Sequence, residues 1–273
     1  MKKMSSLCAC LLGLLMTVNM AMASSTVVVK GSTTVLPIAQ ATAEAYMKHK
    51  PDVNISISGG GSGDGIKALI DKSTDIANSS RDLKPAEIEQ AGKNGVNPMV
   101  HTVAIDAIVP VVNLKNKVNN LTVDQLAKIY TGEITNWKDV GGSDMAIVVI
   151  SRDSSSGTFE TWGNLVLKGA KVTPKAQMQA SNGAIVQAVS KNKYAIGYIG
   201  LGYVNKSLKP LTVNGIKANA QTAISKEYPI ARPLFMMTNG EPQGATADYV
   251  RFVMSKQGQK IVEETGFVPL KTK

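Results

Sequence analysis

The chain has 273 residues, 44% of them hydrophobic and 5% aromatic, and its 30 Lys and Arg residues against 20 Asp and Glu give a formal net charge of +10 at pH 7. This length allows one large domain or two smaller lobes, and the positive charge favours acidic ligands. The lysines are scattered without interleaved aromatic residues, which argues against nucleic-acid binding.

Residues 1–23 have the pattern of a secretory signal peptide. Two lysines open the segment, residues 7–18 are apolar, and Ala21-Met22-Ala23 is a small-x-small cleavage signal. The apolar stretch is too short to span a bilayer as a stable helix. We therefore expect export with cleavage after Ala23.

Both cysteines, Cys8 and Cys10, lie inside this segment, so the mature chain would contain no disulfide. The LCAC stretch resembles a lipoprotein box, but it precedes most of the apolar core instead of ending it, and we do not expect lipidation. Cleavage would also remove Lys2 and Lys3 and take the 30 basic residues to 28, against 20 acidic ones. No later run of 18 apolar residues exists, so we expect a soluble mature protein.

The first part of the mature chain alternates short β-branched runs with helical periods. Pro37 suits the first turn of a helix, since its missing N–H has no partner to lose there. The predicted elements are a strand over 26–30, a helix over 39–49, a strand over 53–59, a short helix over 65–73, a strand over 75–81 and a helix over 85–95.

The next part contains a continuous apolar run over 103–113, which is typical of a strand buried on both faces. Thr122 and Gln125 form a capping-box pair at the head of a helix over 122–130. The remaining predicted elements are a strand over 146–152, a helix from about Thr158, a helix over 183–191, strands over 195–200 and 231–239, and a helical C-terminal part over 246–266.

Strands that alternate with helices predict an α/β architecture with mixed, mostly parallel sheets. No low-complexity linker is present, so two lobes would have to be joined by strands that cross between them. The long apolar runs over 103–113 and 231–239 suit a hinge of two crossing strands. We expect lobe I to comprise residues 24–107 and 232–273, and lobe II to comprise residues 108–231.

Three Ser/Thr/Gly-rich loops follow predicted strands and precede predicted helices: GSTT (31–34), GGGSGDG (59–65) and SRDSSSGT (151–158). A helix N-terminus leaves N–H groups unpaired and carries about half a positive charge, which suits an oxyanion. Hydroxyl groups can donate to the same oxygens, and Arg152 adds a fixed fork of donors. Together the three loops indicate one anion-binding site.

Each loop also has a purely structural explanation. A single Ser/Gly-rich turn is an ordinary helix cap, and Arg152 has Asp153 as an obvious local partner for a surface salt bridge. We favour the anion site because three such turns occur in one basic, exported chain.

Known catalytic motifs fail on inspection. Gly60 and Gly65 have P-loop spacing, but Ile66 stands where Lys is required, and the same residue breaks the dinucleotide fingerprint. A Ser–His–acid arrangement could draw only on His49, which ends a predicted helix, and His101, which opens an apolar run. No His/Cys/carboxylate cluster shows metal-ligand spacing. We therefore predict binding without catalysis, cofactor or metal.

The loop motifs, in this order, resemble those of the phosphate-binding proteins of bacterial phosphate ABC importers. The similar stretches are GSTTVLPIA (31–39), ISGGGSGDGIKAL (57–69), DIANSSRDL (75–83), LAKIYTGEITNWKDVGG (126–142) and SRDSSSGTFETW (151–162). The resemblance covers essentially the whole mature chain. It implies a type II periplasmic binding protein, with two lobes around a hinge, that delivers inorganic phosphate to a membrane permease. A monomer is the simplest expectation.

Carried over by motif, the resemblance implies eight ligand-binding residues. In the first two loops the alignment could slip by one, which would make Ser32 or Gly63 the contact. The implied residues are Thr33, Thr34, Ser62, Ser80, Arg152, Ser156, Gly157 and Thr158.

The loop NSSR (78–81) departs from the family pattern, because Ser80 stands where members often place an Asp that accepts the proton of hydrogen phosphate. Asp64 or Asp82 could compensate, and Arg81 could be a second cation near the ligand or a partner of Asp82. A receptor for sulfate, molybdate or a phosphonate therefore stays open. So do a phosphatase-like hydrolase and a surface protein that uses the fold without transport.

Overall fold

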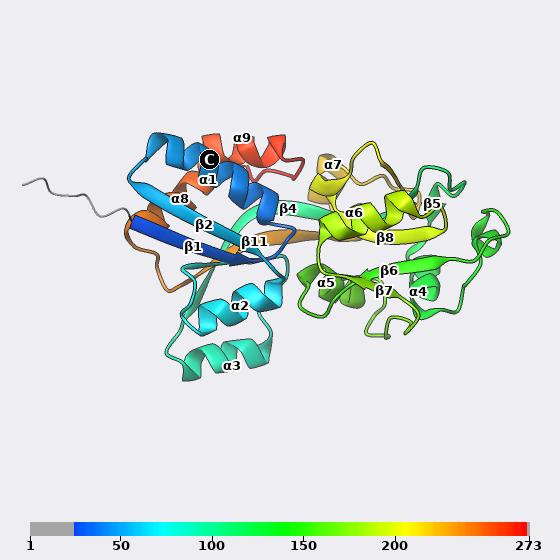
Figure 1. Ribbon diagram of the computed structural model, residues 1–273, viewed down its shortest axis with the longest axis horizontal. Helices are drawn as coiled ribbons and strands as arrows, with labels where there is room; N and C mark the ends of the chain where they lie inside the picture. Colours follow the sequence, from blue (N-terminus) through cyan, green and yellow to red (C-terminus); the bar gives the residue numbers. More distant parts are fainter. Residues whose placement is uncertain (1–24, 272–273) are drawn as a thin grey trace, which may run out of the picture.

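The computed structural model describes residues 25–271, and over this range the chain forms two α/β halves that lie side by side (Figure 1). The predicted signal peptide, its cleavage site and both cysteines fall outside the described residues. Two long strands, β4 (Pro98–Asn113) and β11 (Ala231–Asn239), run where the halves join. The two-lobed α/β fold predicted from the sequence is confirmed.

The other strands are short and belong to one half or the other. They are β1 (Ser25–Gly31), β2 (Val53–Gly59), β3 (Ile76–Ser79), β5 (Asn120–Leu121), β6 (Val148–Arg152), β7 (Gln177–Gln179), β8 (Ala195–Gly200), β9 (Leu208–Pro210) and β10 (Thr212–Val213). We call the half that contains β1, β2 and β3 lobe I, and the half that contains β6, β7 and β8 lobe II.

The helices cover both lobes. They are α1 (Leu36–His49), α2 (Ser62–Ile70), α3 (Pro85–Lys93), α4 (Val123–Thr131), α5 (Gly157–Leu165), α6 (Asn182–Lys191), α7 (Ala220–Ile224), α8 (Gly244–Met254) and α9 (Lys256–Glu264), with 3₁₀ turns η1 (Trp137–Val140) and η2 (Leu201–Tyr203). Between Ser25 and Lys271, none of them combines the length and apolar character needed to cross a bilayer.

A mixed sheet runs through both lobes in the order β2-β1-β3-β11-β4-β8-β6-β7, with β9 also paired to β4. Pairing is parallel within the outer parts, for example between β1 and β2 and between β6 and β8. It is antiparallel where β4 and β11 are involved. The N-terminal part of β4 pairs with β11 up to Ala107, and from Ile108 onward it pairs with β8. The strand β4 therefore passes from lobe I into lobe II without a break.

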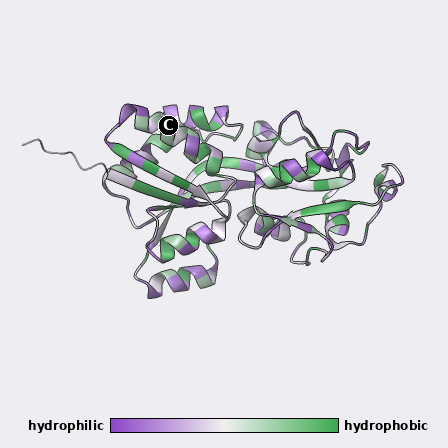
Figure 2. Ribbon diagram, viewed as in Figure 1, coloured by the Kyte–Doolittle hydropathy of each residue, from purple (hydrophilic) through white to green (hydrophobic). Residues whose placement is uncertain are grey.

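Each lobe has its own hydrophobic core. In lobe I, Val27 and Val29 on β1 pack with α1 residues such as Ile38. In lobe II, Trp162 stacks on Tyr198, with ring centroids 4.3 Å apart and planes 8° apart. The hydropathy colouring shows apolar residues concentrated on the strands, whereas the helices alternate between apolar and polar faces (Figure 2). This is the pattern expected when each helix buries one stripe against a sheet.

The parallel strands place their carboxyl ends toward the junction of the lobes. The strands β1, β2, β3 and β6 end at Gly31, Gly59, Ser79 and Arg152, and each is followed by one of the polar loops noted in the sequence. The predicted strand–loop–helix arrangement is confirmed for α1, α2 and α5.

Three details differ from the sequence-based expectation. Helix α2 begins at Ser62 instead of residue 65, because Gly61 is already the extended N-cap. The C-terminal helical part is two helices, since Ser255 is extended and its hydroxyl caps α9 by accepting from the N–H of Gly258 at 3.2 Å. The short elements β5, β7, β9, β10 and α7 were not predicted, because two to five residues are too few to show a period.

Candidate functional site

Thr33 and Thr34 lie in the turn between β1 and α1, and both are buried. The turn begins at Gly31, where φ is +131° and a Cβ would lie 2.3 Å from the carbonyl oxygen of Asn78, so glycine is required. The Thr34 hydroxyl lies 2.9 Å from the Thr158 hydroxyl of lobe II. The Thr33 hydroxyl accepts a hydrogen bond from Nδ2 of Asn182, also in lobe II, at 3.2 Å.

Ser62 and Ser80 come together in lobe I although they follow different strands. Their hydroxyl oxygens are 3.3 Å apart, and the Ser80 N–H donates to Ser62 Oγ at 3.0 Å. Both side chains are buried. Because Ser62 is the first residue of α2, its hydroxyl lies at the positive end of that helix.

Ser156, Gly157 and Thr158 form the start of α5 in lobe II. The hydroxyl of Ser156 caps the helix by accepting from the Phe159 N–H at 3.2 Å. A Cβ at Gly157 would lie 2.4 Å from Ser62 Oγ and 2.7 Å from Ser80 Oγ. The N-terminus of α5 is therefore in close contact with the two lobe I serines.

Arg152 lies at the end of β6 and is 1% exposed. Its Nε and Nη2 atoms donate to the carbonyl oxygens of Gln179 and Ala180 at 3.0 and 2.9 Å. The third nitrogen, Nη1, is buried and has no hydrogen-bond partner in the described part of the chain. Burial lowers the pKa of this guanidinium below its ordinary value, although an arginine stays protonated at neutral pH.

The salt bridge between Arg152 and Asp153, considered as a structural explanation, does not form among the described side chains. The Asp153 carboxylate instead accepts from the N–H and the hydroxyl of Ser155, at 2.9 and 2.6 Å. Arg152 is thus a buried cation without a carboxylate partner in residues 25–271. A buried unpaired charge is costly unless an opposite charge is supplied.

Arg81, whose role the sequence left open, is bound by two glutamates. Its Nη atoms form a two-point contact with Glu87 at 2.7 and 2.6 Å, and its Nε lies 3.0 Å from Glu160 of lobe II. Asp82 contributes only its carbonyl oxygen to Arg81, at 2.8 Å. Asp64 and Asp82 are exposed, so neither carboxylate lies among the buried hydroxyls.

Sequence reasoning missed two groups that connect these loops. Asn182, the first residue of α6, donates from Nδ2 to the hydroxyls of Thr33 and Thr34, at 3.2 and 3.1 Å. Tyr203 donates its hydroxyl to the Thr33 carbonyl oxygen, and burial raises its pKa to about 12, so it is neutral at pH 7. The Ser181-Asn182-Gly183 junction before α6 is a polar strand–helix turn like the others, so it offered a usable signal.

Sequence reasoning also missed the pair Asp106 and Arg232, both buried on the crossing strands. Arg232 donates from Nε and Nη2 to Asp106 Oδ2, at 3.1 and 3.0 Å. Burial raises the pKa of Asp106, and Arg232 opposes that shift. The available signal was one charged residue inside each long apolar run.

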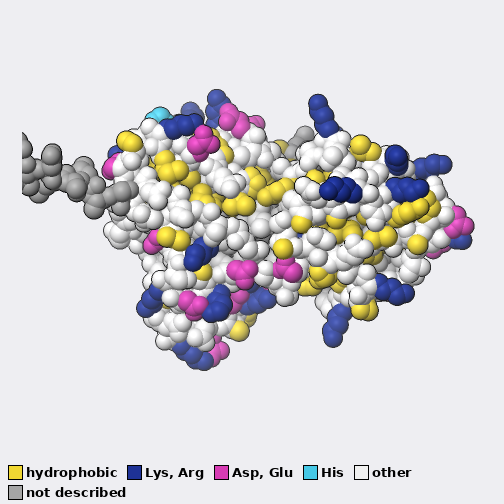
Figure 3. Space-filling view, viewed as in Figure 1, with side chains coloured by type: hydrophobic (Ala, Val, Ile, Leu, Met, Phe, Trp, Pro, Cys, Tyr) yellow, Lys and Arg dark blue, Asp and Glu magenta, His cyan; other side chains and the backbone are white. Residues whose placement is uncertain are grey.

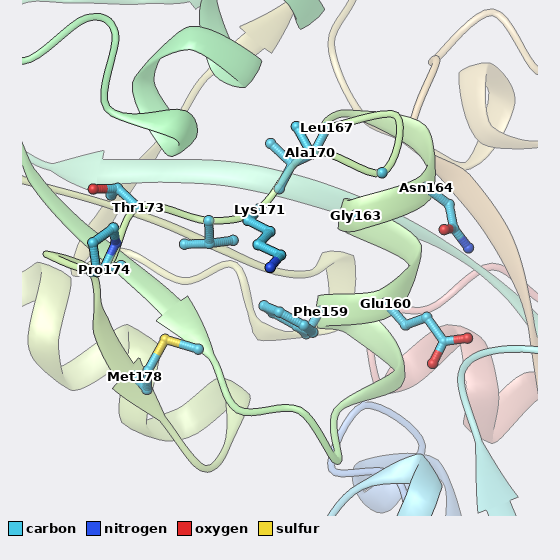
Figure 4. A pocket seen from close by; sticks show the side chains of 13 residues that line it. Phe159, Glu160, Gly163, Asn164, Leu167, Ala170, Lys171, Thr173, Pro174 and Met178 are labelled. Atoms are coloured by element: carbon cyan, nitrogen blue, oxygen red, sulfur yellow. The ribbon is translucent and has the colours of Figure 1, made fainter.

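Two surface pockets flank this cluster. One of about 560 Å³ lies on the outer side of α5 between Phe159, Leu167 and Met178, and Glu160 and Lys171 are its charged lining residues (Figure 4). None of the eight residues implied by the family motifs lines it. Another pocket, of about 410 Å³, lies where the lobes meet and has Ser80, Arg81, Glu160 and Arg232 in its wall.

Neither histidine of the chain lies in the cluster. His49 and His101 hydrogen bond to Gln257 and Thr238, which lie outside the cluster. In residues 25–271 no group of three or more His, Cys, Asp or Glu side chains could hold a metal ion. On the face shown in Figure 3 the Lys and Arg side chains are scattered over both lobes.

Known proteins resemble this chain over most of its length. The model of the PBP superfamily domain matches residues 19–257. The phosphate-binding protein PstS of Borreliella burgdorferi is 39% identical over 254 residues, which cover 89% of each chain. The phosphate-binding protein PstS of Bacillus subtilis is 30% identical over 253 residues, or 91% of this chain and 82% of the relative.

Solved structures give the same result. One similar structure is a phosphate ABC transporter substrate-binding protein from Clostridium perfringens, solved with bound phosphate. Its TM-score is 0.85 and its sequence identity 36%, and the match covers 90% of this chain and 100% of that one. An ABC-type phosphate transport receptor from Vibrio cholerae has a TM-score of 0.74 and 32% identity, with coverage of 89% and 100%.

Proposed function

This chain belongs to the PBP superfamily and to the group of phosphate-binding proteins that its relatives represent, and on that premise we propose that it is an exported receptor for inorganic phosphate. The receptor binds phosphate between its two lobes and delivers it to the permease of an ABC importer. It is exported by the segment 1–23, is cleaved after Ala23, and binds its ligand without chemical change.

The observation that carries this proposal is the buried Nη1 of Arg152, which has no hydrogen-bond partner in residues 25–271, together with the direct contacts between polar loops of the two lobes. The N-termini of α2 and α5 meet here, because Gly157 lies against Ser62 and Ser80. Each helix end carries about half a positive charge, so their approach is unfavourable unless an anion lies between them. A tetrahedral oxyanion supplies that charge, and its oxygens can accept from several donors at once.

The proposed ligand contacts are the eight residues implied by the family motifs. Lobe I provides the donors of three loops, and lobe II provides the donors at the end of β6 and the start of α5. An ionic hydrogen bond contributes roughly 1.5–3 kcal/mol and micromolar retention needs about 8 kcal/mol, so several donors must act together in a site closed to water. The contacts are Thr33, Thr34, Ser62, Ser80, Arg152, Ser156, Gly157 and Thr158.

We also propose that the lobes move as units about the crossing strands, with lobe I as residues 24–107 and 232–273 and lobe II as residues 108–231. The core clusters support a division at this part of β4, since Ala104 packs in the lobe I core, whereas Ala107 and Ile108 pack in the lobe II core. At β11, Ile230 just before the strand packs in the lobe II core, and Leu234 packs in the lobe I core. The chain is expected to act as a monomer.

Isothermal titration of the mature chain with phosphate and with sulfate from about pH 5 to 8 tests the function. We expect saturable binding of one phosphate per chain at micromolar concentration, and its loss in Arg152→Met. No heat with phosphate up to millimolar concentration contradicts the proposal. Preference for sulfate, molybdate or a phosphonate would assign another oxyanion, and turnover of a phosphate ester would indicate a hydrolase.

A further inference from the structure

One guanidinium at the hinge contacts loops of both lobes. Arg232, the second residue of β11, lies directly opposite Asp106 in the register of β4 and β11. Its Nη1 donates to the Ser80 carbonyl oxygen at 3.0 Å, and its Nη2 donates to the Thr158 hydroxyl at 2.8 Å. A longer contact of 3.4 Å reaches the Thr34 hydroxyl. Arg232 therefore connects the strands that cross between the lobes to three of the proposed ligand contacts.

These contacts decide which way the threonine hydrogens can point. A guanidinium and an amide nitrogen can only donate, and a hydroxyl has one hydrogen to give. Thr158 Oγ1 accepts from Arg232, and Thr34 Oγ1 accepts from Asn182 Nδ2 at 3.1 Å. The orientation of the Asn182 amide is fixed, because its Oδ1 accepts from the Gly200 N–H at 3.1 Å.

The two hydroxyls then share a single hydrogen bond of 2.9 Å, in which one of them is the donor. That bond uses one of the two hydroxyl hydrogens. The hydrogen of the other hydroxyl is left to donate to a ligand, because the donor-only neighbours cannot accept it. The Thr34 and Thr158 hydroxyls together can therefore donate one hydrogen bond to an anion.

The charge of Arg232 is already compensated. Asp106 accepts from two of its nitrogens, and the pair contributes no net charge beside the site. Arg152, in contrast, has no carboxylate partner in the described residues. The two arginines therefore differ in role, and only Arg152 can supply the charge that attracts the anion.

We propose that Arg232, held by Asp106, is a positioning residue of the phosphate site. It orients the Thr158 and Thr34 hydroxyls as donors and ties the loops of both lobes to the hinge. This inference rests on the proposed function, because it concerns the same site, and it adds two residues that the loop motifs do not contain.

The experiment must separate positioning from stability, because loss of one partner leaves a buried charge that destabilises the fold. In Arg232→Met combined with Asp106→Asn, neither charge remains, and the amide oxygen can still accept from the Leu201 N–H that Asp106 Oδ1 binds at 2.9 Å. We expect the double variant to regain most of the thermal stability lost in Arg232→Met alone. Its phosphate affinity should nevertheless be at least about tenfold weaker, because the donors are no longer held.

Arg251→Met is the matched control, since Arg251 is exposed on α8 and forms an ion pair with Asp248. It removes the same charge and should leave the phosphate affinity unchanged. If the double variant does not fold, Arg232→Lys serves instead, since it retains the charge next to Asp106 but cannot reach Ser80 and Thr158 together. We expect that variant also to bind phosphate at least about tenfold more weakly.

Phosphate affinity within about twofold of the unaltered chain, in a folded double variant or in Arg232→Lys, overturns the positioning role. The proposed function is tested independently of the positioning role: it is contradicted if the unaltered chain itself does not bind phosphate. Should the unaltered chain bind sulfate instead, the same variants are compared with sulfate as the probe, and the same twofold criterion applies.

Discussion

Hydroxyl groups supply most of the hydrogen-bonding capacity at the proposed site, and the protein already uses their acceptor positions. Ser62 accepts from the Ser80 N–H, and Ser156 accepts from the Phe159 N–H. Thr158 accepts from Arg232. Ser156 therefore has its hydrogen available for a ligand that brings only acceptors. The pairs Ser62–Ser80 and Thr34–Thr158 each use one hydroxyl hydrogen between themselves and keep the other for such a ligand. A fully ionised oxyanion oxygen is such a ligand.

Ser80 Oγ differs from the others, because its contact in the described residues is the Ser62 hydroxyl, which can donate or accept. Ser80→Asp should therefore raise the ratio of phosphate to sulfate affinity at least about tenfold, since a carboxylate can accept the proton of hydrogen phosphate and repels sulfate. Competition titration at pH 7 measures this ratio. The neutral variant Ser80→Asn is the control, and an unchanged ratio in Ser80→Asp would contradict the expectation.

Gly157 provides a steric test of the contact between lobes. In Gly157→Ala the added Cβ would lie 2.4 Å from Ser62 Oγ, so the lobes cannot approach as closely. We expect phosphate affinity to fall at least about tenfold while the melting temperature changes little, because each lobe keeps its own core. Gly163→Ala is the control, since a Cβ there meets nothing within 4 Å and the affinity should not change. Equal affinity in both variants would show that the lobes do not close on Gly157.

At the scale of elements, helix termini do most of the positioning. Helices α2 and α5 begin at Ser62 and Gly157, directly at the junction of the lobes. Helix α3 is placed by Glu87, which accepts from the Lys84 N–H at 2.9 Å and binds Arg81. Glu87 thereby holds Arg81 in position to reach Glu160 across the junction.

Burial acts to raise the pKa of Glu87, but the hydrogen bonds from Arg81 and Lys84 and the positive charges of both residues together hold it below its ordinary value of 4.5. A carboxylate whose pKa is lower in the folded state than in the unfolded state stabilises the fold at a pH above its unfolded-state pKa. This stabilisation is lost as the pH falls through the folded-state pKa. Glu87→Gln should therefore be less stable than the unaltered chain at pH 7, and the difference should shrink below about pH 4.5. Urea unfolding at pH 7, 5 and 3 measures it.

Glu89→Gln on the same helix is the control for this experiment. Glu89 is exposed and pairs with Lys93, so its removal should change stability by less than about 0.5 kcal/mol at any of these pH values. A constant difference between Glu87→Gln and the unaltered chain from pH 7 to 3 would refute the linkage.

At the scale of the whole molecule, direct contacts between the lobes describe a closed arrangement. The Gly63 N–H donates to the Ser155 carbonyl oxygen at 2.9 Å, which joins the second loop of lobe I to lobe II. Outside the cluster of hydroxyls, Glu160 of lobe II binds Lys84 and Arg81 of lobe I at 2.7 and 3.0 Å. These ion pairs form only when the lobes are together, so they favour the closed state without touching the proposed ligand.

Removal of the Glu160 charge should shift the lobes toward an open state. Apparent affinity falls in proportion to the fraction of molecules that is competent to bind. Because an exposed pair such as Lys84–Glu160 contributes no more than about 1 kcal/mol and Arg81 keeps its two-point contact with Glu87, Glu160→Gln should weaken phosphate binding by roughly two- to fivefold. The same variant should have a larger radius of gyration without phosphate, measured by small-angle scattering.

Glu264→Gln on α9 is the matched control, since Glu264 is exposed and lies 3.8 Å from Lys260 on the same helix. It should change neither quantity. An unchanged affinity and radius in Glu160→Gln would mean that these ion pairs do not contribute to closure.

Much of the fold could be predicted because its signals are local. The capping box was predicted from Thr122 and Gln125 alone, and both of its hydrogen bonds are present, at 3.0 and 2.9 Å. The buried run over 103–113 and the strand over 231–239 were identified from apolar length alone. The loop residues proposed as ligand contacts were found through motif order, and their role stays a prediction.

The sequence by itself determined which segments are strands and helices, and which turns are rich in donors, because hydrophobic period and capping act over a few neighbouring residues. Only the tertiary structure decided that, within residues 25–271, Arg152 has no carboxylate partner whereas Arg81 has two. It also paired Asp106 with Arg232, 126 residues apart in the chain. Such pairings depend on strand register and on the approach of the lobes, which no local pattern encodes.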